Sequence, residues 1–312
     1  MRNLRLLSAL FATMVAAIGA STVAADDGYP RLLVIEKPGQ QPTWRSIDNL
    51  FEAVDPDKPD PGGAVLFEDR FAELDVESSS EPPTGARYVD GWVAWNVRHL
   101  EANGDQAYKI LIDGETHEIV EDGLALRGLE RQTQAGLKYT AGMISTERSF
   151  ALVPGTRIDV ELKISRLSPG GHFTLWLLTA SSPAWPPEID FLEVVGSNLT
   201  FPNGPVDLLA FNAIGSPGGP SITFRDHGRA FWQEFHTFSF VYGEDVFRWL
   251  VDGVEVRSQT AFLTVPLYFL ATWELGASGN KDFPGPINKA TKWPFEAIIR
   301  SVKVTTTNGA PG

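Results

Sequence analysis

The chain of 312 residues contains no cysteine. This absence excludes disulfide bridges, thiolate nucleophiles and cysteine ligands for a metal. Stability must therefore come from a packed interior. The composition allows one, because 43% of the residues are hydrophobic and 11% are aromatic. The length is within the range of one large all-β domain, so it does not require two domains.

Basic residues are scarce as well. The 26 Lys and Arg residues are outnumbered by 39 Asp and Glu residues, which gives a formal net charge of −13. This balance argues against nucleic acid or an anionic membrane surface as the main partner, and a neutral substrate fits better. The five histidines do not occur at the spacing of metal ligands, so the sequence indicates no zinc site and no other cofactor.

Long apolar runs are absent except at the N-terminus. Residues 1–25 combine Arg2 and Arg5, an apolar run, and small side chains at Val23 and Ala25. This pattern is typical of a secretory signal peptide cleaved after Ala25. The run is shorter than the roughly 20 apolar residues of a spanning helix, and an uncleaved anchor is the alternative. We expect a secreted or periplasmic protein, without membrane contact after cleavage.

The remaining chain divides by composition into two parts. Residues 26–63 are rich in turn formers, and the stretch PDKPDPGG at their end consists almost entirely of chain breakers and acids. We interpret this part as an N-terminal leader or linker. Residues 64–312 read as one domain, which we expect to be monomeric.

A helical period is missing from that domain, and short runs of β-branched and aromatic residues alternate with turn signals. Residues 157–164, RIDVELKI, alternate between apolar and charged side chains, which is typical of a half-buried antiparallel strand. Asp252 and Gly253 between two strand-like runs indicate a two-residue hairpin. The sequence therefore predicts an all-β sandwich of two curved antiparallel sheets.

The stretch AWPPEIDFLEVVG places three carboxylates in a run that otherwise reads as a buried strand. Acids are rarely buried without a reason. Because side chains alternate along a strand, Glu188 and Asp190 share one face, whereas Glu193 has the opposite parity. A one-residue β-bulge near Phe191 or Leu192 would bring Glu193 back to the acidic face.

This arrangement suits glycoside hydrolysis. With a bulge, the backbones of Glu188 and Glu193 are roughly 13 Å apart, and inclined side chains in a curved sheet shorten the gap. A carboxyl separation of about 5 to 5.5 Å serves a retaining glycosidase, and about 6.5 Å or more serves an inverting one. Three such close carboxylates cannot all ionise cheaply, so at least one pKa must rise. A solvated acidic face or a calcium site built from the same oxygens is the alternative.

The acidic stretch and its surroundings resemble glycoside hydrolase family 16, in particular its bulged, laminarinase-like subgroup with the motif Glu-x-Asp-x-x-Glu. The stretch KYTAGMISTERSF, the hairpin FHTFSFVYGEDVFRWLVDGVEV and the final runs PLYFLATWELG and FEAIIRSVKVTT are similar to family segments in the same order. The resemblance covers roughly residues 65 to 307. It implies a concanavalin-like β-jelly-roll with a concave substrate cleft.

The resemblance also implies roles for the acids. Glu188 would be the nucleophile, Glu193 the general acid and base, and Asp190 the residue that orients and tunes Glu188. The implied reaction is internal hydrolysis of a polysaccharide with retention by double displacement. A structural calcium ion is compatible with the resemblance, but the sequence names no ligand for it.

Further residues are candidates for binding sugar. Trp176 and Trp185 flank the acidic strand and match tryptophans of the family, although most tryptophans of a sandwich belong to the core. Trp273 is expected near the cleft. Asn103 resembles an asparagine that binds sugar in the family. His172 stands where the family commonly has another tryptophan, which is a departure that affects a substrate subsite.

The export pattern together with this resemblance implies an exported, retaining endo-glycosidase, with a polysaccharide as its partner. A β-1,3- or mixed-linkage β-1,3-1,4-glucan is favoured, and galactans and exopolysaccharides remain open. Two alternatives differ in class. One is a carbohydrate-binding jelly-roll without catalysis, which would have no use for three crowded carboxylates. The other is a transglycosylase, which would share every residue named above.

Overall fold

The computed structural model describes most of the predicted domain. The described residues are 31–34, 43–46, 63–79, 92–95, 98–99, 106–108, 115–132, 136–147, 149–179, 187–196, 208–215, 221–226, 234–276 and 286–307. These residues form strands and turns but no helix, so none of them forms a helix that could cross a membrane. The predicted signal peptide lies outside the described residues, as does most of the predicted leader.

The first sheet has ten strands, and in spatial order they are β2 (Thr43–Ser46), β1 (Arg31–Val34), β16 (Ser221–Asp226), β15 (Leu208–Ile214), β14 (Glu188–Val195), β13 (Gly171–Thr179), β20 (Leu267–Leu275), β11 (Met143–Ser145), β5 (Trp92–Trp95) and β4 (Val76–Ser79). The acidic strand β14 lies in the middle of this sheet. Two strands from the segment predicted as a leader, β1 and β2, extend one edge of the sheet.

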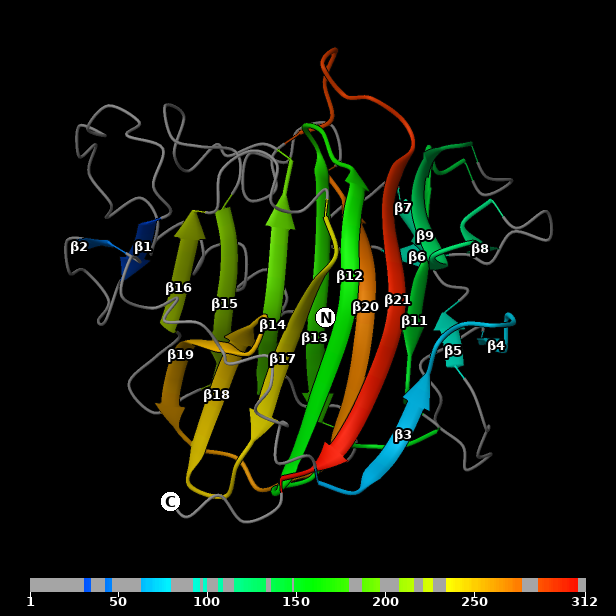
Figure 1. The fold of residues 1–312 in the computed structure, drawn as a ribbon. Coiled ribbons are helices and arrows are strands. Elements are labelled where there is room, and N and C mark those ends of the chain that lie inside the picture. Colours follow the sequence, from blue (N-terminus) through cyan, green and yellow to red (C-terminus); the bar gives the residue numbers. More distant parts are fainter. Residues whose placement is uncertain are drawn as a thin grey trace.

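The second sheet has eleven strands, and they are β19 (Val254–Thr260), β18 (Val246–Val251), β17 (His236–Tyr242), β12 (Thr156–Arg166), β21 (Phe295–Thr306), β9 (Gly123–Glu130), β10 (Tyr139–Ala141), β7 (Gln106–Tyr108) and β6 (Arg98–His99), with β3 (Val65–Asp69) on β21 and β8 (His117–Val120) on β9. The described pairs are antiparallel apart from β4 with β5 and β7 with β10. Figure 1 shows the two sheets as layers, with β12, β17 and β21 in front of β13, β14 and β20. The predicted all-β sandwich is confirmed.

Two local predictions are confirmed by these strands. In β12 every second residue is buried, and Ile158 and Ile164 lie near its two ends on the face that packs against the first sheet. The turn between β18 and β19 consists of Asp252 and Gly253, both with positive φ, at 51° and 78°. Two positive φ angles are what a tight hairpin turn with the twist of its strands requires.

The core lies between the two sheets and is rich in aromatic side chains. Phe191 of β14 packs on Phe240 of β17 with ring centroids 6.4 Å apart, and Phe240 meets Trp249 of β18 edge to face at 5.2 Å. Burying each side chain of this size contributes about 1.5 to 3 kcal/mol. The inner face of β14 is therefore fixed by aromatic packing, and its outer face is free to carry polar groups.

Candidate active site

Strand β14 contains a one-residue β-bulge at Phe191. On the side of β13, Leu175 pairs with Leu192 and the next residue, Trp176, pairs with Asp190, so that Phe191 has no partner in this register. The pairing of β14 with β15 shifts over the same stretch. The predicted bulge is confirmed, and its position is the one that changes the parity of the strand between the second and third acid.

The bulge brings the three carboxylates to one face of the sheet. Phe191 turns into the core, where it is fully buried. Glu188, Asp190 and Glu193 lie opposite alternate residues of β13, on the outer face of the first sheet, and all three are buried. The concave cleft stays a prediction, because residues 180–186 and 197–207 on both sides of this strand lie outside the described part of the chain.

Asp190 is the carboxyl of this row whose pKa is raised. Burial raises the pKa of Asp190 well above its usual value of 3.8, and the charges of Glu188 and Glu193 raise it further. A hydrogen bond with Glu188 acts in the same direction, so the protonated Asp190 donates to the Glu188 carboxylate. The sequence predicted that one pKa must rise, and the structure assigns this rise to the middle acid.

The bulge is supported from the opposite sheet. The indole N–H of Trp249 donates a hydrogen bond of 3.1 Å to the backbone carbonyl oxygen of Asp190. The guanidinium carbon of Arg257 on β19 lies 4.4 Å from the centre of a Trp249 ring. Burial lowers the pKa of Arg257 to about 9. The sequence analysis missed both residues, because Trp249 and Arg257 occur in ordinary strand patterns that carry no sign of the acids.

Glu193 contacts a histidine from the neighbouring strand. His172 Nε2 lies 3.2 Å from Glu193 Oε1 and 2.7 Å from the hydroxyl oxygen of Thr174. The other carboxyl oxygen, Glu193 Oε2, is buried and accepts no hydrogen bond from the described residues. His172, predicted to touch the substrate, is thus placed against the predicted acid and base.

The predicted sugar-binding tryptophans separate into different environments. Trp176 is partly exposed on the outer face beside Asp190, and its indole N–H donates to Thr272 Oγ1 at 3.1 Å. Trp273 is fully buried, and its indole N–H donates to the carbonyl oxygen of Leu126 at 2.9 Å. The prediction for Trp273 is wrong, because its parity on β20 directs it into the core.

Two other predicted sugar ligands are not placed. Trp185 and Asn103 lie outside the described residues.

Strand β20 adds side chains that the sequence analysis missed. Tyr268, Thr272 and Glu274 alternate along the strand on the face of the acids, opposite residues of β13. Burial raises the pKa of the Tyr268 phenol, and the nearby charges of Glu147 and Glu188 raise it further. The available signal was the alternation of Tyr268, Thr272 and Glu274 in LYFLATWEL, which places these three polar side chains on one face of the strand.

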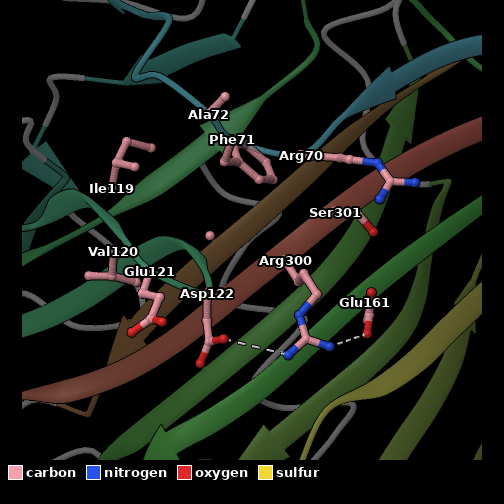
Figure 2. Close-up of a pocket in the computed structure, with 11 residues that line it drawn as sticks. Arg70, Phe71, Ala72, Ile119, Val120, Glu121, Asp122, Glu161, Arg300 and Ser301 are labelled. Atoms are coloured by element: carbon pink, nitrogen blue, oxygen red, sulfur yellow. Dashed lines mark hydrogen bonds and ion pairs between the residues drawn. The ribbon is translucent and has the colours of Figure 1, made fainter.

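A pocket of about 430 Å³ lies elsewhere, on the outer face of the second sheet. Figure 2 shows that the guanidinium of Arg300 lies between Asp122 and Glu161, and it pairs with both carboxylates, so the charges in this pocket are largely compensated. None of the acids of β14 lines this pocket.

Among the described residues, no three metal-ligating side chains cluster to hold an ion, so no ligands are assigned to a calcium ion.

Comparison with known proteins identifies relatives of this chain. The family model described as Glycosyl hydrolases family 16 matches residues 93–265, which is more than half of the chain and includes β14. Endo-1,3-1,4-beta-glycanase ExsH of Rhizobium meliloti (strain 1021) is 25% identical over 226 residues, which are 67% of this chain and 46% of ExsH. Endo-1,3-1,4-beta-glycanase EglC of the same organism is 25% identical over 154 residues, 49% of this chain and 31% of EglC.

The chain therefore spans less than half the length of these curated relatives. Among solved structures, it is similar to the catalytic domain of an endo-1,3-beta-glucanase (laminarinase) from Thermotoga petrophila RKU-1, with a TM-score of 0.62. The match is 20% identical in sequence and covers 79% of this chain and 99% of that domain. At this level of identity the match establishes a shared jelly-roll fold.

Proposed function

This chain belongs to glycosyl hydrolases family 16, and on that premise we propose that it is an exported, retaining endo-glycosidase that hydrolyses internal β-linkages of a polysaccharide. One observation carries the proposal: the bulge at Phe191 puts Glu188, Asp190 and Glu193 in a row on one face of the first sheet. A row of buried acids lowers the stability of the fold. Catalysis that needs two carboxyls in different protonation states would explain why the row is present.

Each acid has a role that its surroundings support. Asp190 holds a proton and donates it in a hydrogen bond to Glu188, which keeps Glu188 ionised and oriented as the nucleophile. Glu193 stands on the far side of Asp190 and acts as general acid and then as general base. Asp190 also separates the charges of the two reacting carboxyls.

The reaction proceeds in two balanced steps. In the first, a carboxylate oxygen of Glu188 forms a bond to the anomeric carbon while the bond to the leaving oxygen breaks, and the proton of Glu193 passes to that oxygen. In the second, Glu193 takes a proton from water, and the water oxygen displaces Glu188 from the anomeric carbon. Both displacements invert the anomeric centre, so the product retains the configuration of the substrate.

We favour a β-1,3- or mixed-linkage β-1,3-1,4-glucan as the substrate. The relatives named endo-1,3-1,4-beta-glycanases and the laminarinase of the same fold support this choice. A neutral glucan also suits a chain with a net charge of −13, which would repel an acidic polymer. Trp176, partly exposed beside Asp190, remains our candidate for stacking on a sugar ring.

The test is a panel of polysaccharides. Purified protein is incubated with β-1,3-glucans, mixed-linkage glucans, agars and carrageenans, and new reducing ends are measured together with product sizes. We expect oligosaccharides from a glucan and an initial product of β configuration by NMR. Glu188→Gln should lower kcat by at least about 1000-fold. A wild-type protein that binds a glucan but releases no reducing ends would instead be the non-catalytic binding module. Products longer than the substrate would identify a transglycosylase.

We also propose that the protein is exported after cleavage behind Ala25 and acts as a monomer. The N-terminal pattern of Arg2, Arg5 and an apolar run supports export. Mass spectrometry of the protein recovered from culture medium or periplasm, after expression of the full chain, would show a mature N-terminus at Asp26. An intact N-terminus in the membrane fraction would contradict the export proposal.

A further inference from the structure

The carboxyl group of Glu193 is held at only one of its two oxygens. Oε1 lies 3.2 Å from Nε2 of His172, and the two side chains are 7% and 9% exposed. Oε2 is equally buried but has no hydrogen-bond partner among the described residues. A buried carboxylate oxygen without a partner is costly, by about 1 to 3 kcal/mol, so its persistence calls for a reason.

The contact follows from the register of the strands. On β13, His172 lies directly opposite Val195 of β14 and shares its outward direction with Thr174, which lies opposite Glu193. His172 and Glu193 are therefore diagonal neighbours on one face, a distance that long side chains span. The straight register between β13 and β20 fixes His172 from the other side. The backbone of His172 is thus fixed by both neighbouring strands.

The groups that face His172 come from three strands. Thr174 Oγ1 of its own strand lies 2.7 Å from Nε2, and Glu274 Oε2 of β20 lies 3.9 Å from Nδ1. Glu193 faces it from β14, where Asp190 lies one pair further along. The imidazole thus stands between two carboxylates, and its Nε2 lies near both a carboxylate oxygen and a hydroxyl oxygen.

We propose that His172 is a positioning residue that fixes Glu193 through Oε1 and so makes Oε2 the oxygen that carries the transferred proton. This inference rests on the proposed function. In the proposed arrangement Nε2–H donates to Oε1, so Oε1 cannot also direct a proton toward Nε2, and a proton on Glu193 resides on Oε2. In the first step that proton passes from Oε2 to the leaving oxygen as the glycosidic bond breaks. In the second step Oε2 receives a proton from the attacking water.

The inference separates His172 from a simple substrate contact. A residue that binds sugar affects KM for every substrate that fills its subsite. A residue that acts through Glu193 affects only the steps in which Glu193 transfers a proton, and it leaves the attack of Glu188 intact. An activated aryl glycoside distinguishes these cases, because its leaving group departs without protonation.

The experiment compares two replacements of His172 in the full chain. His172→Phe fills the space without a donor, and His172→Gln retains an N–H. The substrates are the polysaccharide found in the panel and a 2,4-dinitrophenyl β-glycoside of the oligosaccharide it releases. For His172→Phe we expect kcat on the polysaccharide to fall by about 10- to 100-fold, with KM within about threefold. The value of kcat/KM on the aryl glycoside should stay within about threefold of the wild type.

Azide adds a second readout, since it attacks the glycosyl-enzyme without needing a general base. Azide should raise the kcat of His172→Phe on the aryl glycoside and give a β-glycosyl azide, whereas His172→Gln should need no rescue. If His172→Phe does not fold, His172→Ala replaces it with the same expectation. His236→Ala is the matched control. This histidine also pairs with a carboxylate, at 2.7 Å from Asp252 Oδ2, but it lies on β17 of the other sheet. His236→Ala should leave the kinetic constants for both substrates unchanged.

The outcomes are distinct. Equal losses on both substrates with a raised KM would overturn the inference and make His172 a substrate contact. Unchanged kinetics of His172→Phe would overturn it as well. A wild-type protein that is inactive on both substrates would instead overturn the proposed function, and the inference would fall with it.

Discussion

The indole N–H of Trp249 crosses the sandwich to donate a hydrogen bond of 3.1 Å to the backbone carbonyl oxygen of Asp190. Trp249 belongs to β18 of the second sheet, whereas Asp190 lies beside the bulge of β14 in the first. A bulge leaves ladder groups without their usual partners, and an unpaired buried carbonyl is costly. The core side of the second sheet thus stabilises the irregular backbone that carries the acids.

Trp249→Phe should therefore weaken both stability and activity. The aromatic ring is retained, but the Asp190 carbonyl loses its donor, which should cost about 1 to 3 kcal/mol in the free energy of unfolding. A less firmly held bulge should also lower kcat by about 10-fold, because small displacements of reacting groups are expensive. Denaturant unfolding and the reducing-end assay measure the two effects.

Trp92→Phe provides the matched control. The indole N–H of Trp92 donates to Asp69 Oδ2 at 2.7 Å, and this tryptophan is equally buried but lies away from the acids. Its replacement should lower stability without lowering kcat. If the two variants reduce kcat by the same factor, Trp249 has no special role in supporting the bulge.

The raised pKa of Asp190 predicts how stability depends on pH. The folded protein keeps the proton of Asp190 above pH 3.8, where the unfolded chain has released it. Stability should therefore fall as the pH rises from about 4 toward the folded pKa, by at most about 1.4 kcal/mol per pH unit. Asp190→Asn removes this proton and should be more stable than the wild type near neutral pH, while its activity falls.

Denaturant unfolding of both proteins between about pH 4 and 8 measures this dependence. The difference in unfolding free energy, wild type minus Asp190→Asn, should decrease with rising pH. A difference that is constant or increases would mean that Asp190 is ionised in the folded protein. Glu188→Gln, which removes the charge next to Asp190, should narrow the pH range over which stability falls without abolishing the fall, because burial is the largest cause of the shift.

His117 predicts a pH effect of the opposite sign. Burial lowers its pKa from 6.5 to about 4, and Nε2–H donates to the carbonyl oxygen of Met143 at 2.8 Å. The unfolded chain binds a proton first as the pH falls through 6.5, so the stability contributed by the neutral imidazole is lost between pH 6.5 and about 4. The full loss is roughly 3 kcal/mol.

His117→Gln isolates this effect, because the amide retains a donor for the Met143 carbonyl and does not titrate. The variant should be less stable than the wild type at about pH 7, where it packs less well, and the gap should narrow toward pH 4. Unfolding free energies across this range measure the gap. A gap that widens with acid would contradict a neutral buried His117 in the folded protein.

The parts of the fold that follow from local pattern could be predicted from the sequence. The alternation of β12 and the Asp252-Gly253 turn each encode one structure. The bulge at Phe191 could also be predicted, because three acids on an apolar strand have no low-cost arrangement without it. In each case the local side chains are compatible with only one backbone arrangement at low cost in free energy.

Prediction from the sequence failed where both faces of a strand are buried. Strand β20 is buried over almost its entire length, so its pattern does not tell the core face from the face of the acids. Trp273, expected near the cleft, is consequently found in the core. The contact of His172 with Glu193 and the support of Asp190 by Trp249 depend on register and on packing between sheets. No short stretch of sequence encodes either relationship.

Trp176 and Trp273, which lie on opposite faces of the first sheet, give a final prediction. Trp176 lies on the outer face beside Asp190 and donates to Thr272 at 3.1 Å, whereas Trp273 is fully buried and packs edge to face on Phe173 with centroids 5.2 Å apart. Trp176→Ala removes a surface for stacking on a sugar ring, and we expect KM for the polysaccharide to rise by about 10-fold, equivalent to about 1.4 kcal/mol. Its effect on the free energy of unfolding should be smaller than that of Trp273→Phe.

Trp273→Phe leaves the Leu126 carbonyl without its donor and should cost about 1 to 3 kcal/mol of stability with KM unchanged. Steady-state kinetics and denaturant unfolding of both variants test the assignment, and a KM that rises for Trp273→Phe but not for Trp176→Ala would reverse the faces of β13 and β20.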